Sequence, residues 1–252
     1  MLSPSLGPRA LVPFLFGLSV LAWLALALWG QSPYARYLDH QQLDTRGEGT
    51  LLPIFVLGWL LMIVAMMLPT SVPLIRLFAM MTRLRADHHW LVLLLLLGYV
   101  GVWGIFGVSV HALDAGLHAL VDHNDYLAER AWLIGPAVLG MAGIYQFTPL
   151  KYHCLDRCRS PLAFVTERWR GRRPRAAAFN LGVSHGVYCL GCCWSLMLLL
   201  FAVGTGSVGW MLGLGALMAV EKNMRFGRRL SAPVGVVLVG CAVVSVVLAA
   251  TA

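Results

Sequence analysis

Seven apolar runs impose the strongest constraint on how this chain of 252 residues can fold. They cover residues 11–29, 51–69, 90–110, 132–150, 179–203, 207–220 and 233–251. All but the sixth, which is short and rich in glycine, approach the roughly 20 residues that a helix needs to cross a bilayer. Charged residues make up only 12% of the chain, which excludes a soluble globular class. The continuous runs predict an all-α, polytopic transmembrane helical bundle of about seven spans, forming one domain over residues 1–252.

Basic residues are confined almost entirely to alternate loops. With a cytoplasmic N-terminus, the cytoplasmic side collects 16 of the 19 lysines and arginines, and the outer loops keep Arg36, Arg46 and Arg130. This asymmetry follows the positive-inside rule and predicts that the N-terminus is cytoplasmic. The basic residues behind the net charge of +8 then set the orientation in the membrane and contact membrane lipids. We therefore expect no nucleic-acid partner. The first run is too long for a signal-peptide core, and we expect it to be retained.

The fifth apolar run contains a stripe of residues that can hold a metal ion. Its members, at i, i+4, i+7 and i+8, are His185, Cys189, Cys192 and Cys193. These spacings place the four side chains on one face of a helix. Gly182 and Gly186 form a G-x-x-x-G on much the same side, which lets a second helix approach closely.

A second pair of cysteines ends the preceding apolar run. Cys154 and Cys158 are four residues apart and share a face if the fourth helix continues past Pro149. Consecutive spans are antiparallel neighbours, so we expect this pair to meet the stripe. A single shared site requires the fifth helix to begin late or to break within residues 182–191. Otherwise the cysteines form two sites in series, and the sequence leaves both arrangements open.

Thiols grouped at membrane depth favour a soft metal ion. Cu(I) is best matched to thiolate and thioether ligands, and zinc is the alternative. Cys189 and Cys192 also form a C-x-x-C, the spacing of a dithiol redox site, although such sites need an exposed thiol. Cys241, alone in the last run, is interpreted as packing.

Other candidate ligands are secondary. Met66 and Met67 are possible thioether ligands in a run that Pro69 should break or kink. An outer helical face carries His111, Asp114 and His118, which would form a weak ion-collecting patch. Glu221 and Lys222, at the end of the sixth run, are interpreted as an ion pair at the inner interface.

The residues around these cysteines resemble a bacterial family of predicted metal-binding integral membrane proteins, a domain of unknown function with Cys-rich CxxxC and HGxYCxGCCW blocks. The matching segments are residues 65–69, 145–161 and 185–197, followed by Glu221 and Lys222. The resemblance implies a multi-pass protein of the bacterial inner membrane and supports the five cysteines outside the last run as the candidate metal site. It identifies no reaction.

Three functions remain as hypotheses. The first is copper handling by transport, storage or delivery, with a metal donor or acceptor protein as partner. The second is a membrane thiol–disulfide oxidoreductase that uses a quinone. The third is a structural or assembly subunit of a larger membrane complex with a structural zinc. No nucleotide loop or catalytic triad is present in the sequence, which favours a role other than that of an enzyme.

Overall fold

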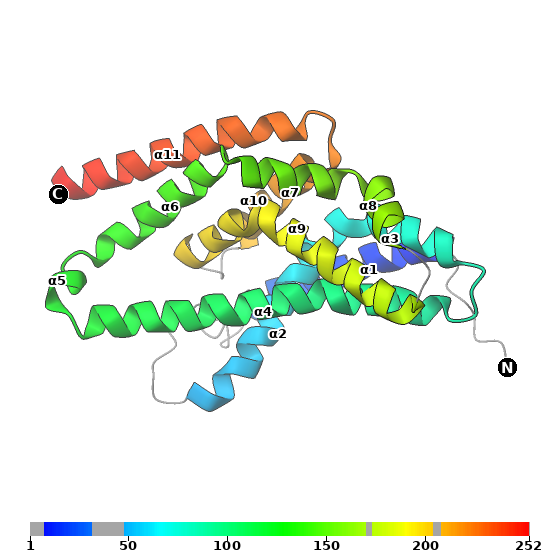
Figure 1. Cartoon of the computed structure of the whole chain (residues 1–252). Coiled ribbons are helices and arrows are strands. Elements are labelled where there is room, and N and C mark those ends of the chain that lie inside the picture. The colour runs from blue at the N-terminus through cyan, green and yellow to red at the C-terminus, as the bar shows by residue number, and fades with distance from the viewer. Residues whose placement is uncertain (1–7, 32–47, 170–172, 204–207, 252) are drawn as a thin grey trace.

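A computed structural model describes residues 8–31, 48–169, 173–203 and 208–251, and within these ranges every regular element is a helix. Arg36 and Arg46 lie outside them. The elements are α1 (Pro8–Gly30), α2 (Glu48–Met66), α3 (Leu68–Thr82), α4 (His88–Asp122), α5 (Asp125–Ala128), η4 (Ala131–Leu133), α6 (Ile134–Tyr145), α7 (Pro149–Arg159), α8 (Pro161–Arg168), α9 (Pro174–Val203), α10 (Val208–Asn223) and α11 (Gly227–Thr251). The predicted all-α class is therefore confirmed (Figure 1).

Four helices in the described ranges are long and apolar enough to cross a membrane. They lie at Ala10–Gly30, His88–Asp122, Pro174–Leu200 and Gly227–Thr251. Two bent pairs, α2 with α3 and α6 with α7, raise the number to six if each pair is one span. Helix α10, which matches the predicted sixth span, has 16 residues and does not meet the same length criterion. In α11 only 11% of the apolar window is buried, as is expected of a helix that faces lipid.

The first break lies between α2 and α3, which are bent by 67°. Pro69 stands in the first turn of α3, where its missing N–H costs no hydrogen bond, so the expected break at this proline is confirmed. The main-chain oxygen of Met67 accepts hydrogen bonds from Thr70 Oγ1 (2.8 Å), Ser71 Oγ (3.3 Å) and the Tyr99 hydroxyl (3.4 Å). Side chains thus satisfy a carbonyl at the bend, as an irregular backbone at membrane depth requires.

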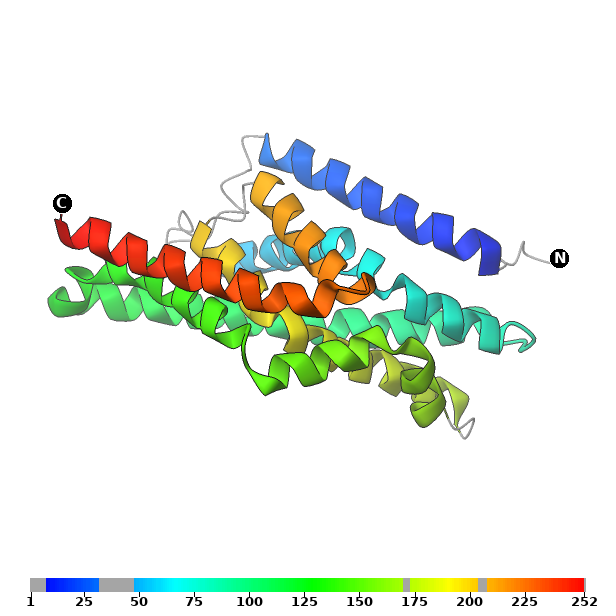
Figure 2. The same ribbon diagram turned by 90° about the horizontal axis from the view of Figure 1, so that it is seen from above.

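The second break lies between α6 and α7, which are bent by 64°. Thr148 caps α7, since its Oγ1 accepts a hydrogen bond from the Lys151 N–H (3.3 Å), and Pro149 occupies the first turn. The fourth helix therefore does not continue straight past Pro149, but Cys154 and Cys158 still lie four residues apart on one helix, α7. As a result, α7 turns away from the axis of α6 and lies against α9 and α10 (Figures 1 and 2).

Glycines bring α4 and α9 into close contact. A Cβ added to Gly182 would lie 2.0 Å from the main-chain oxygen of Leu95, and one added to Gly98 would lie 2.4 Å from that of Phe179. A Cβ on Gly186 would lie 2.9 Å from Val102. The predicted close approach at the G-x-x-x-G is confirmed, but the helix that approaches is α4 rather than the helix that carries Cys154 and Cys158.

The two ends of the bundle differ in charge. The beginning of α1, the connection from α3 to α4 and the beginning of α9 lie at one end, whereas α5 and the end of α11 lie at the other (Figures 1 and 2). The connection from α3 to α4 carries Arg83 and Arg85, and the segment around α5 carries Asp122, Asp125 and Glu129. In the described residues, this basic connection and this acidic segment therefore lie at opposite ends of the bundle.

Candidate metal centre

Five cysteines from α7 and α9 belong to one buried cluster. Cys154, Cys189, Cys192 and Cys193 are buried in it, and Cys158 packs against it from the side. Cys192 Sγ and Cys193 Sγ both donate to the main-chain oxygen of Cys189, at 3.0 and 2.9 Å. The structure reaches this arrangement by neither of the two expected routes, because α9 is continuous and begins early, at Pro174. Instead, the bend between α6 and α7 directs α7 against α9 and so brings the two groups of cysteines together.

Gly191 makes room for the α7 cysteines. A Cβ added at this position would lie 2.6 Å from Cys154 Sγ and 3.3 Å from Cys154 Cβ. The Tyr145 hydroxyl, at the end of α6, donates a hydrogen bond to the main-chain oxygen of Gly191. The glycine between Cys189 and Cys192 therefore serves the contact between helices, which the spacing of the cysteines alone does not reveal.

The ammonium of Lys222 lies among sulfur atoms. Its Nζ is 2.9 Å from Cys189 Sγ, 3.8 Å from Cys193 Sγ and 3.7 Å from Met67 Sδ. Thr70 Oγ1 is 3.4 Å from the same nitrogen, and the Tyr99 hydroxyl is 3.1 Å from Cys189 Sγ. These groups come from α3, α4, α9 and α10 and from the bend after α2, so the sulfurs are the meeting point of five parts of the fold.

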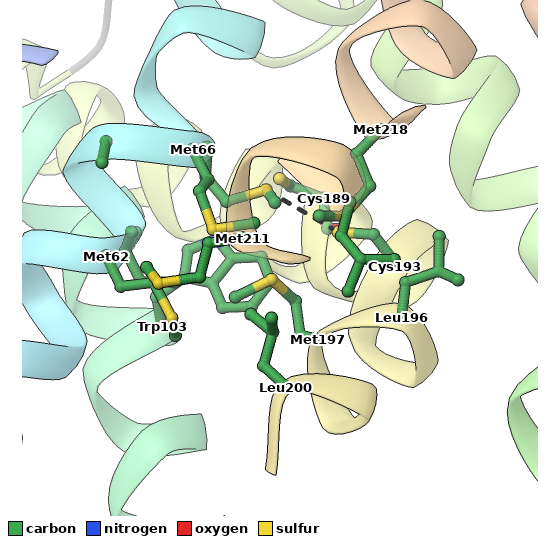
Figure 3. Packing of buried hydrophobic residues seen from close by; sticks show 14 of the residues in the cluster. Met62, Met66, Trp103, Cys189, Cys193, Leu196, Met197, Leu200, Met211 and Met218 are labelled. Atoms are coloured by element: carbon green, nitrogen blue, oxygen red, sulfur yellow. Dashed lines mark hydrogen bonds between the residues drawn. The ribbon is translucent and has the colours of Figure 1, made fainter. Parts of the chain in front are cut away.

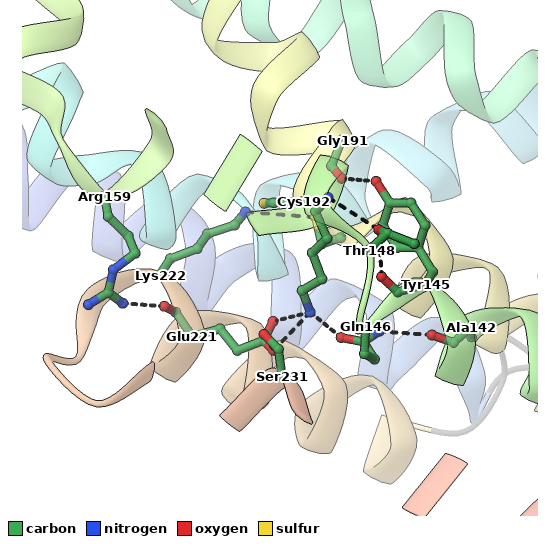
Figure 4. A network of polar contacts seen from close by, with 12 residues as sticks. Ala142, Tyr145, Gln146, Thr148, Arg159, Gly191, Cys192, Glu221, Lys222 and Ser231 are labelled. Atoms are coloured by element: carbon green, nitrogen blue, oxygen red, sulfur yellow. Dashed lines mark hydrogen bonds and ion pairs between the residues drawn. The ribbon is translucent and has the colours of Figure 1, made fainter. Parts of the chain in front are cut away.

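Glu221 faces away from Lys222 and forms a separate network (Figure 4). Lys151 Nζ lies 2.8 and 2.9 Å from the two carboxylate oxygens of Glu221, and Ser231 Oγ donates to Oε1 at 2.8 Å. Lys151 also donates to Gln146 Oε1. Both members of the ion pair are buried, with side chains 0% and 2% exposed. The predicted ion pair between Glu221 and Lys222 at the interface is therefore wrong. The observed pair of Lys151 with Glu221 joins the first turn of α7, just after the break in the fourth span, to α10.

Methionines extend the sulfur-rich region beyond the cysteines. Met67 Sδ lies 3.9 Å from Cys193 Sγ. Six of the 11 methionines are buried in the same cluster: Met62, Met66, Met67, Met197, Met211 and Met218. Figure 3 shows several of them gathered beside Cys189 and Cys193. Of these six, the sequence pattern indicates Met66 and Met67 as possible ligands, whereas the others lie in apolar runs where methionine is ordinary packing.

His185 lies one turn before Cys189 but makes other contacts. Its Nε2 is 3.1 Å from Ser71 Oγ, and its ring stacks on that of Tyr99 with centroids 5.4 Å apart. Its Nδ1 is buried and has no hydrogen-bond partner among the described residues. The helical stripe thus places the imidazole at the edge of the cluster, against α3 and α4.

The outer patch remains separate from the cysteines. His111 stacks on Phe55 at 4.5 Å between centroids, and His118 Nδ1 lies 3.7 Å from Asp114 Oδ2. His111 is 12 residues beyond Tyr99 on α4, or about 18 Å along the helix. His118 and Asp114 of this predicted patch thus lie within ion-pair distance of each other, and His111 packs on α2.

The cluster offers soft donors around one position rather than a finished coordination shell. In the ranges that the structure describes, no three His, Cys, Asp or Glu side chains form a ready metal site. What converges at the Lys222 ammonium is two cysteine sulfurs and one thioether, a donor set that suits a soft monovalent cation better than a hard divalent one. Cys241, the sixth cysteine, is exposed on α11.

Comparison with known proteins gives one match. The family model described as "PpoB2: Copper chaperone" matches residues 56–245, about three quarters of the chain. The matched segment runs from α2 to α11 and includes both helices that carry the clustered cysteines. No curated protein and no solved structure matches the chain. The extent of the match shows that the chain belongs to the PpoB2 family of copper chaperones.

Proposed function

We propose that this protein binds Cu(I) inside the membrane through its clustered sulfurs and delivers it to a partner protein. Copper is the cargo, so it must be bound firmly and also released. The candidate ligands are Cys189, Cys193 and Met67 around one buried position, with Cys154, Cys158 and Cys192 beside them and His185 at the edge.

The observation that carries this proposal is the convergence of three sulfurs, two from α9 and one from the bend after α2, on one buried cation. Thiolate and thioether sulfur select Cu(I) over harder ions. Burying charged sulfur is costly unless a cation balances it, which explains why the position already holds an ammonium. Membership of the copper-chaperone family supports copper as the metal, and the soft donor set supports its monovalent oxidation state.

A titration of the purified protein in detergent micelles tests this proposal. Cu(I) is added without oxygen in competition with a chromophoric chelator, and we expect the protein to bind it. X-ray absorption of the loaded protein should then show sulfur neighbours at about 2.3 Å from the copper. Replacing Cys189 and Cys193 together by Ser should abolish the site, whereas Cys241→Ser should leave it intact. Equal copper binding by the wild type and the double variant, or preferential binding of zinc, would refute the proposal.

The dithiol hypothesis receives less support from the geometry. Cys189 and Cys192 are 1% and 2% exposed, and Cys192 Sγ donates to the main-chain oxygen of Cys189 at 3.0 Å within a regular helix. A dithiol redox site needs a thiol that its partner can reach. Thiol trapping under oxidising conditions distinguishes the two functions, since a redox site would show a reversible disulfide that copper chelators do not affect.

We also propose seven crossings of the bacterial inner membrane, with the beginning of α1 on the cytoplasmic side. The beginning of α1 and the end of α11 lie at opposite ends of the bundle, as an odd number of crossings requires (Figures 1 and 2). Helix α10, at 16 residues, extends about 24 Å and supplies the additional crossing. A reporter fused after α11 should be active only on the outer side, whereas six crossings would place it in the cytoplasm.

A further inference from the structure

The chain contains two lysines among its 19 basic residues, and both are buried. Lys151 is paired with Glu221. Lys222 is 6% exposed, and within the described ranges its ammonium contacts no carboxylate. Its neighbours are sulfur and one hydroxyl. A buried ammonium without a carboxylate needs another partner of opposite charge, and here the cysteine sulfurs are the groups in position to supply it.

The Lys222 ammonium has the properties of a removable stand-in for a metal ion. It carries one positive charge at a compact head on a flexible stem. Lysine also lacks the planar guanidinium of arginine, so its ammonium interacts with the three sulfurs as a point charge and not through a fixed bidentate geometry. Helix α10 ends at Asn223, one residue later. Because long lysine stems near helix ends can carry the head group to an aqueous interface, the ammonium has a place to go.

We propose that the Lys222 ammonium occupies the copper position of the empty protein, and that Cu(I) displaces it from Cys189, Cys193 and Met67. This inference rests on the proposed function and adds a release mechanism to it. On binding, the N–H···S contact to the Cys189 thiolate breaks and Cu–S bonds form, while the ammonium and the Cys193 thiol keep their protons and no electron is transferred. One positive charge replaces another at the sulfurs, so a divalent ion would leave a surplus charge in a buried place. On delivery, the returning ammonium helps the copper to leave.

Amine labelling tests the displacement directly, because the two lysines are buried probes of matched chemistry. Folded protein in micelles is treated with an amine-acylating reagent with and without one equivalent of Cu(I), and each lysine is read by mass spectrometry. We expect Lys222 to react several times faster in the copper-loaded protein and Lys151 to be unchanged. The gain should be absent from Cys189→Ser. Unchanged Lys222 reactivity in protein that has bound copper overturns the inference while leaving the proposed function intact. Failure of the wild type to bind copper refutes the proposed function itself.

The rate of copper release to excess chelator provides a second test. Lys222→Leu keeps a buried stem and adds no sulfur donor. Without a returning ammonium, release should slow by roughly ten- to a hundredfold, the range expected for loss of hydrogen bonds to a charged group. Asn223→Ala, at the exposed neighbour, should release copper at the wild-type rate. Faster release from Lys222→Leu would show that the lysine merely supports the site and would overturn the inference.

Discussion

Replacing Gly191 by alanine should disrupt the contact between α7 and α9 at the cysteine cluster. The new methyl carbon would lie 2.6 Å from Cys154 Sγ, whereas carbon and sulfur pack comfortably at about 3.6 Å. The sulfur must therefore give way by about 1 Å. Rotation to another staggered rotamer, which moves Sγ by roughly 3 Å, would take it out of the cluster. The Cβ of Cys154, at 3.3 Å, leaves little room for α7 to remain unmoved.

The expected effect on stability is smaller than the effect on copper affinity. Overpacking a core costs about 1–3 kcal/mol, and alanine regains about 0.5–1 kcal/mol over glycine in a helix. The net loss in unfolding free energy should thus be about 1 kcal/mol. Displacing a group that provides or supports a metal ligand typically lowers affinity by about 10–100-fold. We therefore expect Gly191→Ala to fold and to bind Cu(I) roughly ten times more weakly or worse.

A double-variant cycle identifies the cause of the loss. Affinity is measured by competition with a chromophoric Cu(I) chelator, and stability by denaturation in micelles. Gly101→Ala makes the same change on α4 where nothing lies within 4 Å of the new carbon, and it should leave both quantities near wild type. In a Cys154→Ala background, Gly191→Ala should cost little stability because the clashing sulfur is gone. Wild-type affinity in Gly191→Ala would refute the assignment of the α7 cysteines to the site.

Three further outcomes are expected. Glu221→Gln should lower the unfolding free energy by about 3–5 kcal/mol, because it leaves the buried Lys151 ammonium unpaired, and denaturation within 1 kcal/mol of wild type would contradict that role. Cys241→Ser should change neither copper stoichiometry nor stability, since this thiol is exposed on α11; loss of one copper would show a site there. Gly182→Ala should cost about 3 kcal/mol or more, because the new carbon would meet the rigid main-chain oxygen of Leu95 at 2.0 Å. Normal yield and melting of that variant would contradict the close packing of α4 and α9.

The helical class and the grouping of the cysteines could be predicted because each follows from local patterns. Long apolar runs have few folded solutions at membrane depth, and a helix fixes the relative directions of residues at i, i+4, i+7 and i+8. The break at Pro149 could also be predicted, because Thr148 followed by Pro149 is the pattern of an N-cap and a first-turn proline that begin a new helix. The residues after it, from Lys151 to Arg159, are mostly polar, and the pattern alone left open whether the helix continues past Pro149.

The partner of each buried charge could not be predicted in the same way. Adjacent residues on a helix point about 100° apart, so Glu221 and Lys222 cannot face each other across α10. This rule excludes the predicted pair but does not say that Lys151, 70 residues earlier, meets the glutamate. That contact depends on the direction of α7 after its break. The methionines other than Met66 and Met67 were missed for a similar reason, since their convergence depends on how α2, α9 and α10 cross.

The charges of the buried centre explain why its groups lie where they do. Lys151 and Glu221 cancel, and their network fixes the direction of α7, which presents Cys154 to α9. The Glu221 carboxylate binds Lys151 and lies on another side of α10 from the Lys222 ammonium, so the second ammonium is left to the sulfurs. A site built for stability alone would contain neither lysine, because apolar side chains of similar volume usually replace a buried ion pair at no loss. Retaining one neutral pair and one exchangeable cation is reasonable only where another cation must enter and leave. In the proposed function the two positive charges of the centre thus have different roles: one holds the helices, and the other occupies the position that copper takes.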